Sequence, residues 1–310
     1  CTDQHHSWIQ NSLMVSVTVR GTAPYKNIIT NGFVVDTSGK KISKSDQGTG
    51  KSSKPMTADH YYNKYGGDMV RLWVSSVDYQ NDVPFSEELF QQTGESYRRI
   101  RNTFRVLLGN LHDAVRSSGF SPSEAPAYTL VDRWILERLH AVTAECLAGY
   151  AAYDFRKVVS TITQFVSGDL SALYIDITKD RLYCDAANSP RRRAAQAAIR
   201  EVTETLVKLL APILAYTADE TWEFLGHSDS VHLQPFPVCS SGFSPSAADS
   251  VIPAVEDLLK ARAVIQQAIE AARQAKQIGS NLEATVKLTL PEVGFGHTIF
   301  ADVPALQEFF

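Results

Sequence analysis

Helical periodicity between residues 128 and 239 constrains the fold of this chain more than any other feature. Apolar residues recur there every three or four positions, the spacing at which they share one buried face of an α-helix. The stripes are Ile135, Leu139, Val142, Cys146 and Tyr150; Phe155, Val158, Ile162 and Phe165; and Ile199, Val202, Leu206, Leu209 and Ile213. Pro212 breaks the third stripe, because its ring removes a helix hydrogen bond. Four or more such helices joined by modest loops predict an antiparallel helical bundle.

Smaller signals refine this bundle. Thr217 and Glu220 have the spacing of a capping box and predict a short helix that starts there. Trp134 and Trp222 fall on apolar stripes and are expected in the core. His112, His140 and His232 show no ligand-like spacing and need no special role.

Residues 1–85 follow a different pattern, in which short apolar runs alternate with loops. The β-branched segment IITNGFVVD predicts a buried strand that ends at Asp36, and TSGKK follows as a turn. From Ser86 the pattern becomes helical, with one face formed by Tyr97, Ile100, Phe104, Leu108, Leu111 and Val115. The fold class is therefore expected to be α/β plus all-α.

Two Ser/Pro/Gly-rich stretches suggest domain boundaries. SSGFSPSEAP ends a connecting helix and linker over residues 86–127, and the bundle is expected over 128–239. VCSSGFSPSAADS then separates the bundle from a final region, 254–310, which contains a helix near 254–277 and the strand-like LEATVKLTL.

Composition limits the classes of function. The chain has 310 residues, 44% hydrophobic and 21% charged, and a formal net charge of -4, so nucleic-acid contact requires a local basic surface. The cysteines at 1, 146, 184 and 239 form no CxxC pair, which disfavours a zinc site and a disulfide framework. No apolar run approaches the roughly 20 residues of a membrane span. We expect a soluble, cytoplasmic protein with no membrane partner.

The stretch GKKISKSDQGTG, residues 39–50, is the candidate site for chemistry. Lys41 and Lys44 follow a strand end, where α/β folds usually place ligand-binding loops. Ammonium groups and the backbone N–H groups near Gly39, Gly48 and Gly50 suit phosphate oxygens. Residue types alone equally allow a solvated, lysine-rich turn. Neither the Walker nor the dinucleotide fingerprint is present.

A family resemblance bears on this choice. KISKS at 41–45 resembles the KMSKS signature loop of class I aminoacyl-tRNA synthetases, with Ile42 in place of methionine. NGFVVDTSGKKISKS is similar to the strand, turn and loop of that family. YYNKYGGDMVRLWV resembles the helix and strand that come next.

Further segments narrow the resemblance to isoleucyl-tRNA synthetases. TDQHHSW at 2–8 resembles the SDQHRGW segment of those enzymes, and DLSALYIDITKDRLYCD at 169–185 resembles their anticodon-binding domain. LAPILAYTADETWEFL, SVHLQPFP and IGSNLEATVKL extend the similarity over essentially the whole chain. The resemblance implies the second half of a Rossmann-like catalytic domain over 1–85, followed by a helical anticodon-binding domain.

The resemblance also implies a reaction: ATP, with Mg²⁺, activates isoleucine, and the acyl group passes to tRNA(Ile). Carried over by position, Lys44 is the ATP-binding lysine, Lys41 assists it, and Ser43 and Ser45 shape the loop. Asp3, Gln4 and Trp8 match positions at the aminoacyl-adenylate site, with Trp8 as a wall of the isoleucine pocket. A one-methylene difference supplies only about 1–3 kcal/mol of discrimination, so the family needs separate editing.

Several departures limit what this chain is expected to do. The His-Ile-Gly-His half of the ATP site and a segment long enough for editing are absent, and His6 and Ser7 replace the Arg-Gly of the family. The segment DQGTGKSSKPMTADHYY, which follows the loop, is also a few residues longer than the corresponding segment in most members of the family. The expectation is a C-terminal portion of a synthetase, inactive in aminoacylation by itself.

Basic residues outside the loop have two interpretations each. Arg98, Arg101 and Arg105 lie at helical spacing and suit either RNA phosphates or a solvated face. The same choice applies to the run Arg191, Arg192 and Arg193. Lys179, Asp180 and Arg181 suit a family motif or a structural ion-pair cluster.

Two other classes of protein remain open at this stage. One is a freestanding, non-catalytic tRNA-binding module, and the other is a helical bundle that binds proteins. Binding of tRNA with an affinity that falls with salt is expected of the synthetase portion and of the tRNA-binding module. It is not expected of the protein-binding bundle.

Overall fold

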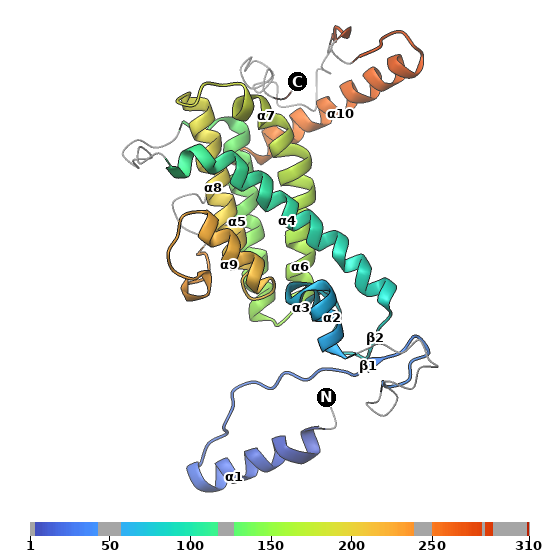
Figure 1. The fold of residues 1–310 in the computed structure, drawn as a ribbon, viewed down its shortest axis with the longest axis vertical. Coiled ribbons are helices and arrows are strands. Elements are labelled where there is room, and N and C mark those ends of the chain that lie inside the picture. The colour runs from blue at the N-terminus through green and yellow to red at the C-terminus, as the bar shows by residue number, and fades with distance from the viewer. Residues whose placement is uncertain are drawn as a thin grey trace.

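A computed structural model describes residues 4–42, 57–116, 127–238, 250–280, 283–287 and 309. The described chain is mostly helical, with one small sheet (Figure 1). Its α-helices are α1 (Gln10–Arg20), α2 (Ala58–Tyr65), α3 (Gly67–Ser76), α4 (Glu87–Arg116), α5 (Leu130–Ala151), α6 (Phe155–Gln164), α7 (Ile175–Tyr183), α8 (Pro190–Leu210), α9 (Ala215–Phe224) and α10 (Ile252–Gln274). The π-helices η2 (His5–Ile9) and η4 (Phe165–Tyr174) and the 3-10 helix η5 (Val231–Leu233) complete the helical elements.

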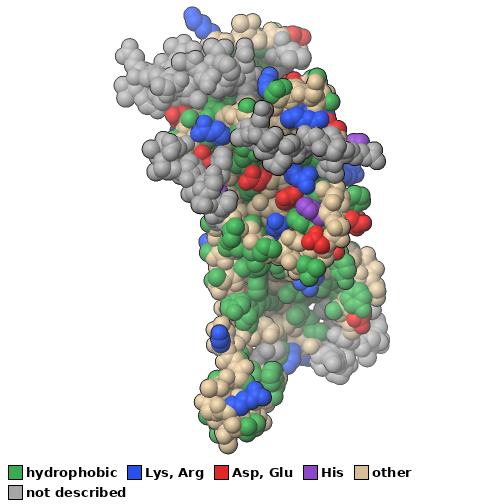
Figure 2. All heavy atoms as spheres, turned by 90° about the vertical axis from the view of Figure 1, so that its left-hand side faces the viewer, with side chains coloured by type: hydrophobic (Ala, Val, Ile, Leu, Met, Phe, Trp, Pro, Cys, Tyr) green, Lys and Arg blue, Asp and Glu red, His purple; other side chains and the backbone are tan. Residues whose placement is uncertain are grey.

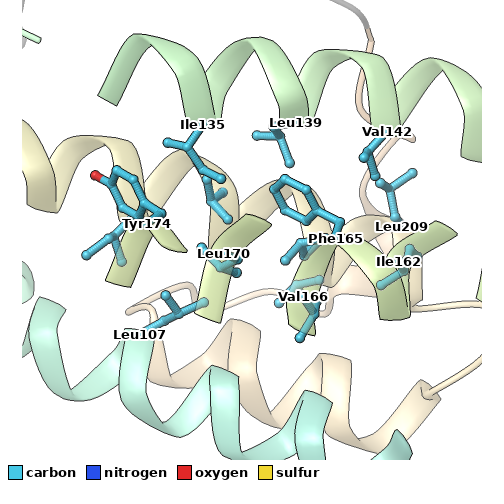
Figure 3. Close-up of a cluster of buried hydrophobic side chains, with 14 of the residues drawn as sticks. Leu107, Ile135, Leu139, Val142, Ile162, Phe165, Val166, Leu170, Tyr174 and Leu209 are labelled. Carbon is cyan, nitrogen blue, oxygen red and sulfur yellow. The ribbon is translucent and has the colours of Figure 1, made fainter. Parts of the chain in front are cut away.

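The main core lies between α4, α5, α8 and the continuous path α6–η4–α7. Figure 3 shows Ile135, Leu139 and Val142 of α5 directed toward Phe165 and Leu170. All three predicted stripes are buried here except for Tyr150 and Phe155, which are half-buried. Trp134 and Trp222 are core residues, as expected. Because burying one Leu or Ile side chain contributes roughly 1.5–3 kcal/mol, this cluster dominates the stability of the fold.

Polar side chains fix the ends of the core helices. Thr129 and Asp132 form a capping box at the start of α5. Glu137 of α5 is also buried, and it accepts hydrogen bonds from the Ser250 hydroxyl (2.8 Å) and the Val251 backbone nitrogen (3.0 Å). The carboxylate at the Val251 N–H satisfies a donor that the start of α10 leaves unpaired.

A second, smaller cluster lies beside the sheet. Tyr61 of α2, Met69 of α3 and Phe85 pack with Phe90, the first fully buried residue of α4. The rings of Tyr61 and Phe85 meet edge to face with centroids 5.0 Å apart. Helix α4 therefore begins in this cluster and continues along the main core, away from β1 and β2 (Figure 1).

The strand expected over IITNGFVVD is much shorter in the structure. Within this segment only Val34–Val35 form a strand, β1, which pairs in parallel with β2 (Val83–Pro84). Ile28 and Ile29 are 43% and 50% exposed, so the expectation of a buried strand there is wrong. Within the described residues, no strand pairs with Ile28 or Ile29. The pattern of apolar residues in a sequence does not show whether a strand has a partner.

Two other local expectations are also wrong. The run expected as a helix followed by a strand forms two helices, α2 and α3, separated at Gly66, whose φ is +93°. Met69 and Leu72, three residues apart, are buried on one face of α3, which is helical spacing. Thr217 lies inside α9 rather than at its start, because α9 begins at Ala215.

The C-terminal region is only partly described. Helix α10 confirms the expected helix, and residues 283–287 contain no strand. The remainder of LEATVKLTL, the stretch SSGFSPSEAP at 117–126 and residues 239–249 of VCSSGFSPSAADS lie outside the described residues.

Candidate functional site

The turn before the candidate loop is built around Asp36. Its carboxylate accepts hydrogen bonds from the backbone nitrogens of Ser38 and Lys40, each at 2.9 Å, and from the Ser38 hydroxyl at 2.6 Å. Gly39 has φ +81°, which a residue without Cβ adopts at no steric cost. The sequence TSGKK therefore forms the expected turn, and it returns the chain beside β1.

Lys41 is the first predicted site residue on this returning segment. It forms an antiparallel bridge with Val35, and the next residue, Ile42, donates its N–H to the Val34 carbonyl at 3.3 Å. The Lys41 ammonium lies 3.7 Å from the centroid of the Phe33 ring, a cation–π contact. Ser43, Lys44 and Ser45 lie outside the described residues.

The residues just before β1 pack closely against the residues just before β2. A Cβ at Gly32 would lie 2.2 Å from the Asn81 carbonyl oxygen, so only glycine fits there. The Phe33 backbone nitrogen donates to Asp82 at 2.7 Å, and the Val83 nitrogen donates to the Phe33 carbonyl at 2.8 Å. The base of the loop is thus fixed to residues about fifty positions later.

The N-terminal candidates are placed separately. Asp3 lies outside the described residues, and Gln4 precedes η2. Trp8 lies in η2, and its side chain is 63% exposed. No residue of η2 or α1 is buried. In the described segments, the structure gives no ring contact or hydrogen bond between Trp8 and Lys41.

Helix α3 connects the loop region with the bundle. The buried carboxylate of Asp68 accepts hydrogen bonds from the backbone nitrogens of Tyr216 (3.2 Å) and Thr217 (2.7 Å), at the start of α9. Arg71, one turn later, donates to the carbonyl oxygens of Pro212 (2.5 Å) and Ile213 (3.1 Å). We call Asp68 and Arg71 the α3 clamp. Neither residue could be predicted from sequence, because no local pattern reveals a partner more than 140 positions away.

The first set of arginine candidates divides by partner. On α4, Arg98 is paired with Glu95, and Arg101 with Glu220 at 3.2 Å and the Tyr97 hydroxyl at 3.2 Å. Arg105 is exposed.

The run at the start of α8 divides in the same way. Arg192 is paired with Asp113 at 3.0 Å, and Arg193 with Gln196 at 2.9 Å. Arg191 is exposed, so only the first arginine of the run points its charge to solvent.

The third basic candidate is part of the core. The Arg181 guanidinium donates two hydrogen bonds to the carboxylate of Asp132, each at 3.0 Å, and both residues are buried. The Tyr174 hydroxyl donates to the same carboxylate at 2.7 Å. Arg181 therefore belongs to a structural ion pair, one of the two interpretations open from sequence.

Charges of both signs cover the surface. Figure 2 shows acidic and basic side chains interspersed over the upper part of one face, with hydrophobic side chains gathered below them. Across the described ranges, no group of three His, Cys, Asp or Glu side chains could hold a metal ion. Among the helices described, none combines the length and apolar composition needed to cross a membrane.

Two family models match this chain. The anticodon-binding domain of tRNA ligases matches residues 132–288, half of the chain. The class I tRNA synthetases of the I, L, M and V type match residues 1–86.

Two similar curated relatives are isoleucine–tRNA ligases. The isoleucine–tRNA ligase of Methylacidiphilum infernorum is 43% identical over 291 residues, which cover 93% of this chain and 30% of the relative. The isoleucine–tRNA ligase of Oceanobacillus iheyensis is 40% identical over 299 residues, covering 94% and 31%. The chain thus spans about a third of the length of these relatives.

A solved structure shares the fold. It is a ternary complex of an Agrobacterium radiobacter LeuRS with tRNA and LeuAMS, with a TM-score of 0.60, 18% sequence identity, and coverage of 79% of this chain and 28% of that one.

Proposed function

Because the chain belongs to the family of tRNA ligases that carry an anticodon-binding domain, we propose that it serves as the signature-loop and tRNA-binding portion of an isoleucine–tRNA ligase. The observation that carries this proposal is the order of the two family matches, 1–86 and then 132–288, in a chain that is 43% and 40% identical to two isoleucine–tRNA ligases. The partners are isoleucine, ATP with Mg²⁺, and tRNA(Ile), and the setting is the cytoplasm.

The proposal assigns the fold as well. Residues 1–85 form the second half of a Rossmann-like catalytic domain, 86–127 a connecting helix and linker, and 128–239 an antiparallel helical bundle that binds the anticodon arm. Residues 254–310 begin a C-terminal junction region. In this division the α3 clamp joins the first part to the bundle, because it holds the segment after the loop against the turn between α8 and α9.

In this proposal the loop lysines act on the triphosphate. The carboxylate of isoleucine attacks the α-phosphate and pyrophosphate leaves, so negative charge on the phosphates requires stabilisation. Lys44 binds the phosphates directly. Lys41 adds positive charge from the base of the loop, and the rigid turn at Asp36 supports that position. Ser43 and Ser45 shape the loop and donate hydrogen bonds.

The N-terminal residues contribute to the same reaction. Asp3 and Gln4 line the aminoacyl-adenylate site, and Trp8 forms one wall of the isoleucine pocket. The large exposed fraction of Trp8 supports this role, because its ring is available to a ligand rather than engaged in the core.

The first experiment is filter binding of this chain to purified tRNAs specific for isoleucine and for valine, at two salt concentrations. We expect a preference for the isoleucine tRNA, and an affinity that falls with salt because phosphate contacts release counterions. Failure to bind either tRNA would contradict the proposal.

A second experiment tests the loop. Periodate-oxidised ATP, which reacts with nearby lysines, is expected to label Lys44 and Lys41, and excess ATP is expected to suppress this labelling. Lys64 is the internal control, since its ammonium is held 2.8 Å from Glu87 and this contact raises its pKa. If Lys44 and Lys64 were labelled to the same extent, and excess ATP suppressed neither, the assignment of the loop to the ATP site would be wrong.

A further inference from the structure

A groove of about 510 Å³ runs between α4 and the η4–α7 segment. Arg99, Asn102, Thr103 and Val106 line it on the α4 side, and Ser171 and Ile175 line the other side. The Thr103 and Ser171 hydroxyls are 3.1 Å apart across the floor. The two walls are therefore in contact below, and the groove is open above.

Arg99 differs from the arginines beside it. Arg98 is paired with Glu95 and Arg101 with Glu220, whereas in the described part of the chain Arg99 is paired with no carboxylate. Its side chain is exposed at the wall of the groove. The neutral hydroxyl and amide groups around it donate hydrogen bonds and carry no negative charge. This chemistry suits an anionic, oxygen-rich ligand such as a phosphodiester.

Tyr183 stands beyond the other end of the groove. It is the last residue of α7, it is 66% exposed, and its hydroxyl lies 3.4 Å from the side-chain nitrogen of Asn110 on α4. Ile175, Lys179 and Tyr183 follow each other at four-residue spacing, so they share one face of α7. The ring thus lies on the same side of α7 as the groove.

Charged side chains of both signs surround this face of α7, but the carboxylates among them lie outside the groove. Lys179 is exposed and paired at 3.0 Å with Asp176, which also receives Arg262 at 2.8 Å. Asp180 is exposed on the next position of α7, and Asp113 is occupied by Arg192. None of these carboxylates lines the groove.

The dimensions suit several nucleotides. From Arg99 to Asn110, α4 rises by roughly 16 Å at 1.5 Å per residue. Figure 1 shows α7 toward the end of the bundle that is opposite β1 and β2. An aromatic ring exposed at the end of a cationic, hydroxyl-lined groove is the arrangement by which proteins stack one unpaired base and follow the backbone of a single strand.

We propose that this groove binds a single-stranded stretch of the tRNA, with a phosphate at Arg99 and an unpaired base stacked on Tyr183. The inference rests on the proposed function for its partner. It adds the path of the RNA and the two side chains that contact it.

The test is fluorescence anisotropy of labelled tRNA(Ile) with this chain over a series of salt concentrations. Tyr183→Ala is expected to weaken binding roughly five-fold to a hundred-fold at every salt concentration, because a stacking contact is lost. Tyr183→Phe keeps the ring and is expected to bind as the unaltered chain does. Arg99→Gln is expected to reduce the slope of log affinity against log salt by about one unit, because one phosphate contact is lost.

Matched controls separate these contacts from general surface effects. Arg98→Gln removes a neighbouring but paired arginine, and Phe224→Ala removes another exposed aromatic residue, 67% exposed on α9. Both are expected to leave affinity and slope unchanged. Thermal unfolding of each variant checks that the fold is retained, which the exposure of these side chains favours.

The possible outcomes are distinct. If the unaltered chain binds tRNA and both Tyr183→Ala and Arg99→Gln bind equally well, the groove proposal is overturned and the proposed function stands. If Tyr183→Phe loses as much affinity as Tyr183→Ala, the hydroxyl and not stacking is responsible, and the proposal fails. If the unaltered chain binds no tRNA, both proposals fail.

Discussion

Asp68 on α3 caps α9 across 149 residues of sequence, with its carboxylate oxygen 2.7 Å from the backbone nitrogen of Thr217. Arg71 on the same helix binds carbonyl oxygens just beyond the end of α8. Each charge meets the helix end of opposite partial charge, because N-termini carry positive and C-termini negative partial charge. The α3 clamp therefore attaches the loop side of the molecule to the bundle through two complementary contacts.

The first prediction concerns Asp68. Asp68→Ala leaves the N–H groups of Tyr216 and Thr217 without their acceptor, and we expect the free energy of unfolding to fall by about 1–2 kcal/mol. Urea unfolding measures this change. Glu88→Ala, an exposed acid in the first turn of α4, is the matched control and is expected to have little effect. Equal unfolding midpoints for the two variants would count against the clamp.

The second prediction concerns the buried pair of Arg181 and Asp132. Arg181→Met leaves the Asp132 carboxylate buried with only the Tyr174 hydroxyl and its capping contacts, and we expect unfolding to become easier by about 3–5 kcal/mol. Lys179→Met, which breaks an exposed pair on the same helix, is expected to change stability by less than about 1 kcal/mol. If the two variants lost similar amounts of unfolding free energy, the buried Arg181–Asp132 pair would be no more important for stability than the exposed pair.

The third prediction concerns the cysteines. Burial raises the pKa of the Cys146 thiol from 9.0 to about 12, so it stays protonated in the folded chain. Iodoacetamide at neutral pH is expected to modify exposed Cys184 but not Cys146, as read by peptide mass spectrometry. Modification of Cys146 at the same rate in the folded chain would contradict its burial.

The same shift predicts a pH dependence. Between about pH 9 and 12, the unfolded chain loses the Cys146 proton while the folded chain retains it. The unfolded state then binds fewer protons, so stability falls as pH rises through this window. Cys146→Ala removes this contribution, and its stability is expected to fall less steeply over the window than that of the unaltered chain.

The fourth prediction compares two glycines. Gly32→Ala places a Cβ 2.2 Å from the Asn81 oxygen, so we expect β1 and β2 to separate and the loop base to become sensitive to protease. Gly168→Ala, in η4, meets nothing within 4 Å and is expected to be neutral or slightly stabilising. Limited proteolysis followed by mass spectrometry distinguishes the two. Resistance of both variants to cleavage near β1 would contradict the close approach at Gly32.

The helices of the bundle could be predicted from sequence because each stripe of apolar residues reports the burial of its own helix. The short β1 could not, since strand formation depends on a partner, and here only Val34 and Val35 find one. The start of α9 could not be predicted for a related reason. Its cap is the distant Asp68 rather than the local Thr217, so the capping-box pattern gave the wrong residue.

The candidate site shows the same limit. The lysines of the loop were identified through a resemblance, but the contact of Lys41 with Phe33 depends on the backbone reversal at Asp36 and Gly39. The arginine runs looked uniform in sequence. The structure divides them by partner, because an acid such as Glu220 or Asp113 reaches only one or two members of each run.

The length of α4 has a mechanical consequence. Phe90 is fixed in the small aromatic cluster, while Leu111 lies in the main core at the other end of the helix, roughly 31 Å away at 1.5 Å per residue. A tilt of only about 5° at Phe90 would shift Leu111 by roughly 3 Å, on the same helical geometry. Tyr97 of α4 also meets α9, the helix that Asp68 caps, because its hydroxyl lies 3.0 Å from the Thr217 hydroxyl. A tilt of α4 would therefore act directly on the residue that the α3 clamp holds.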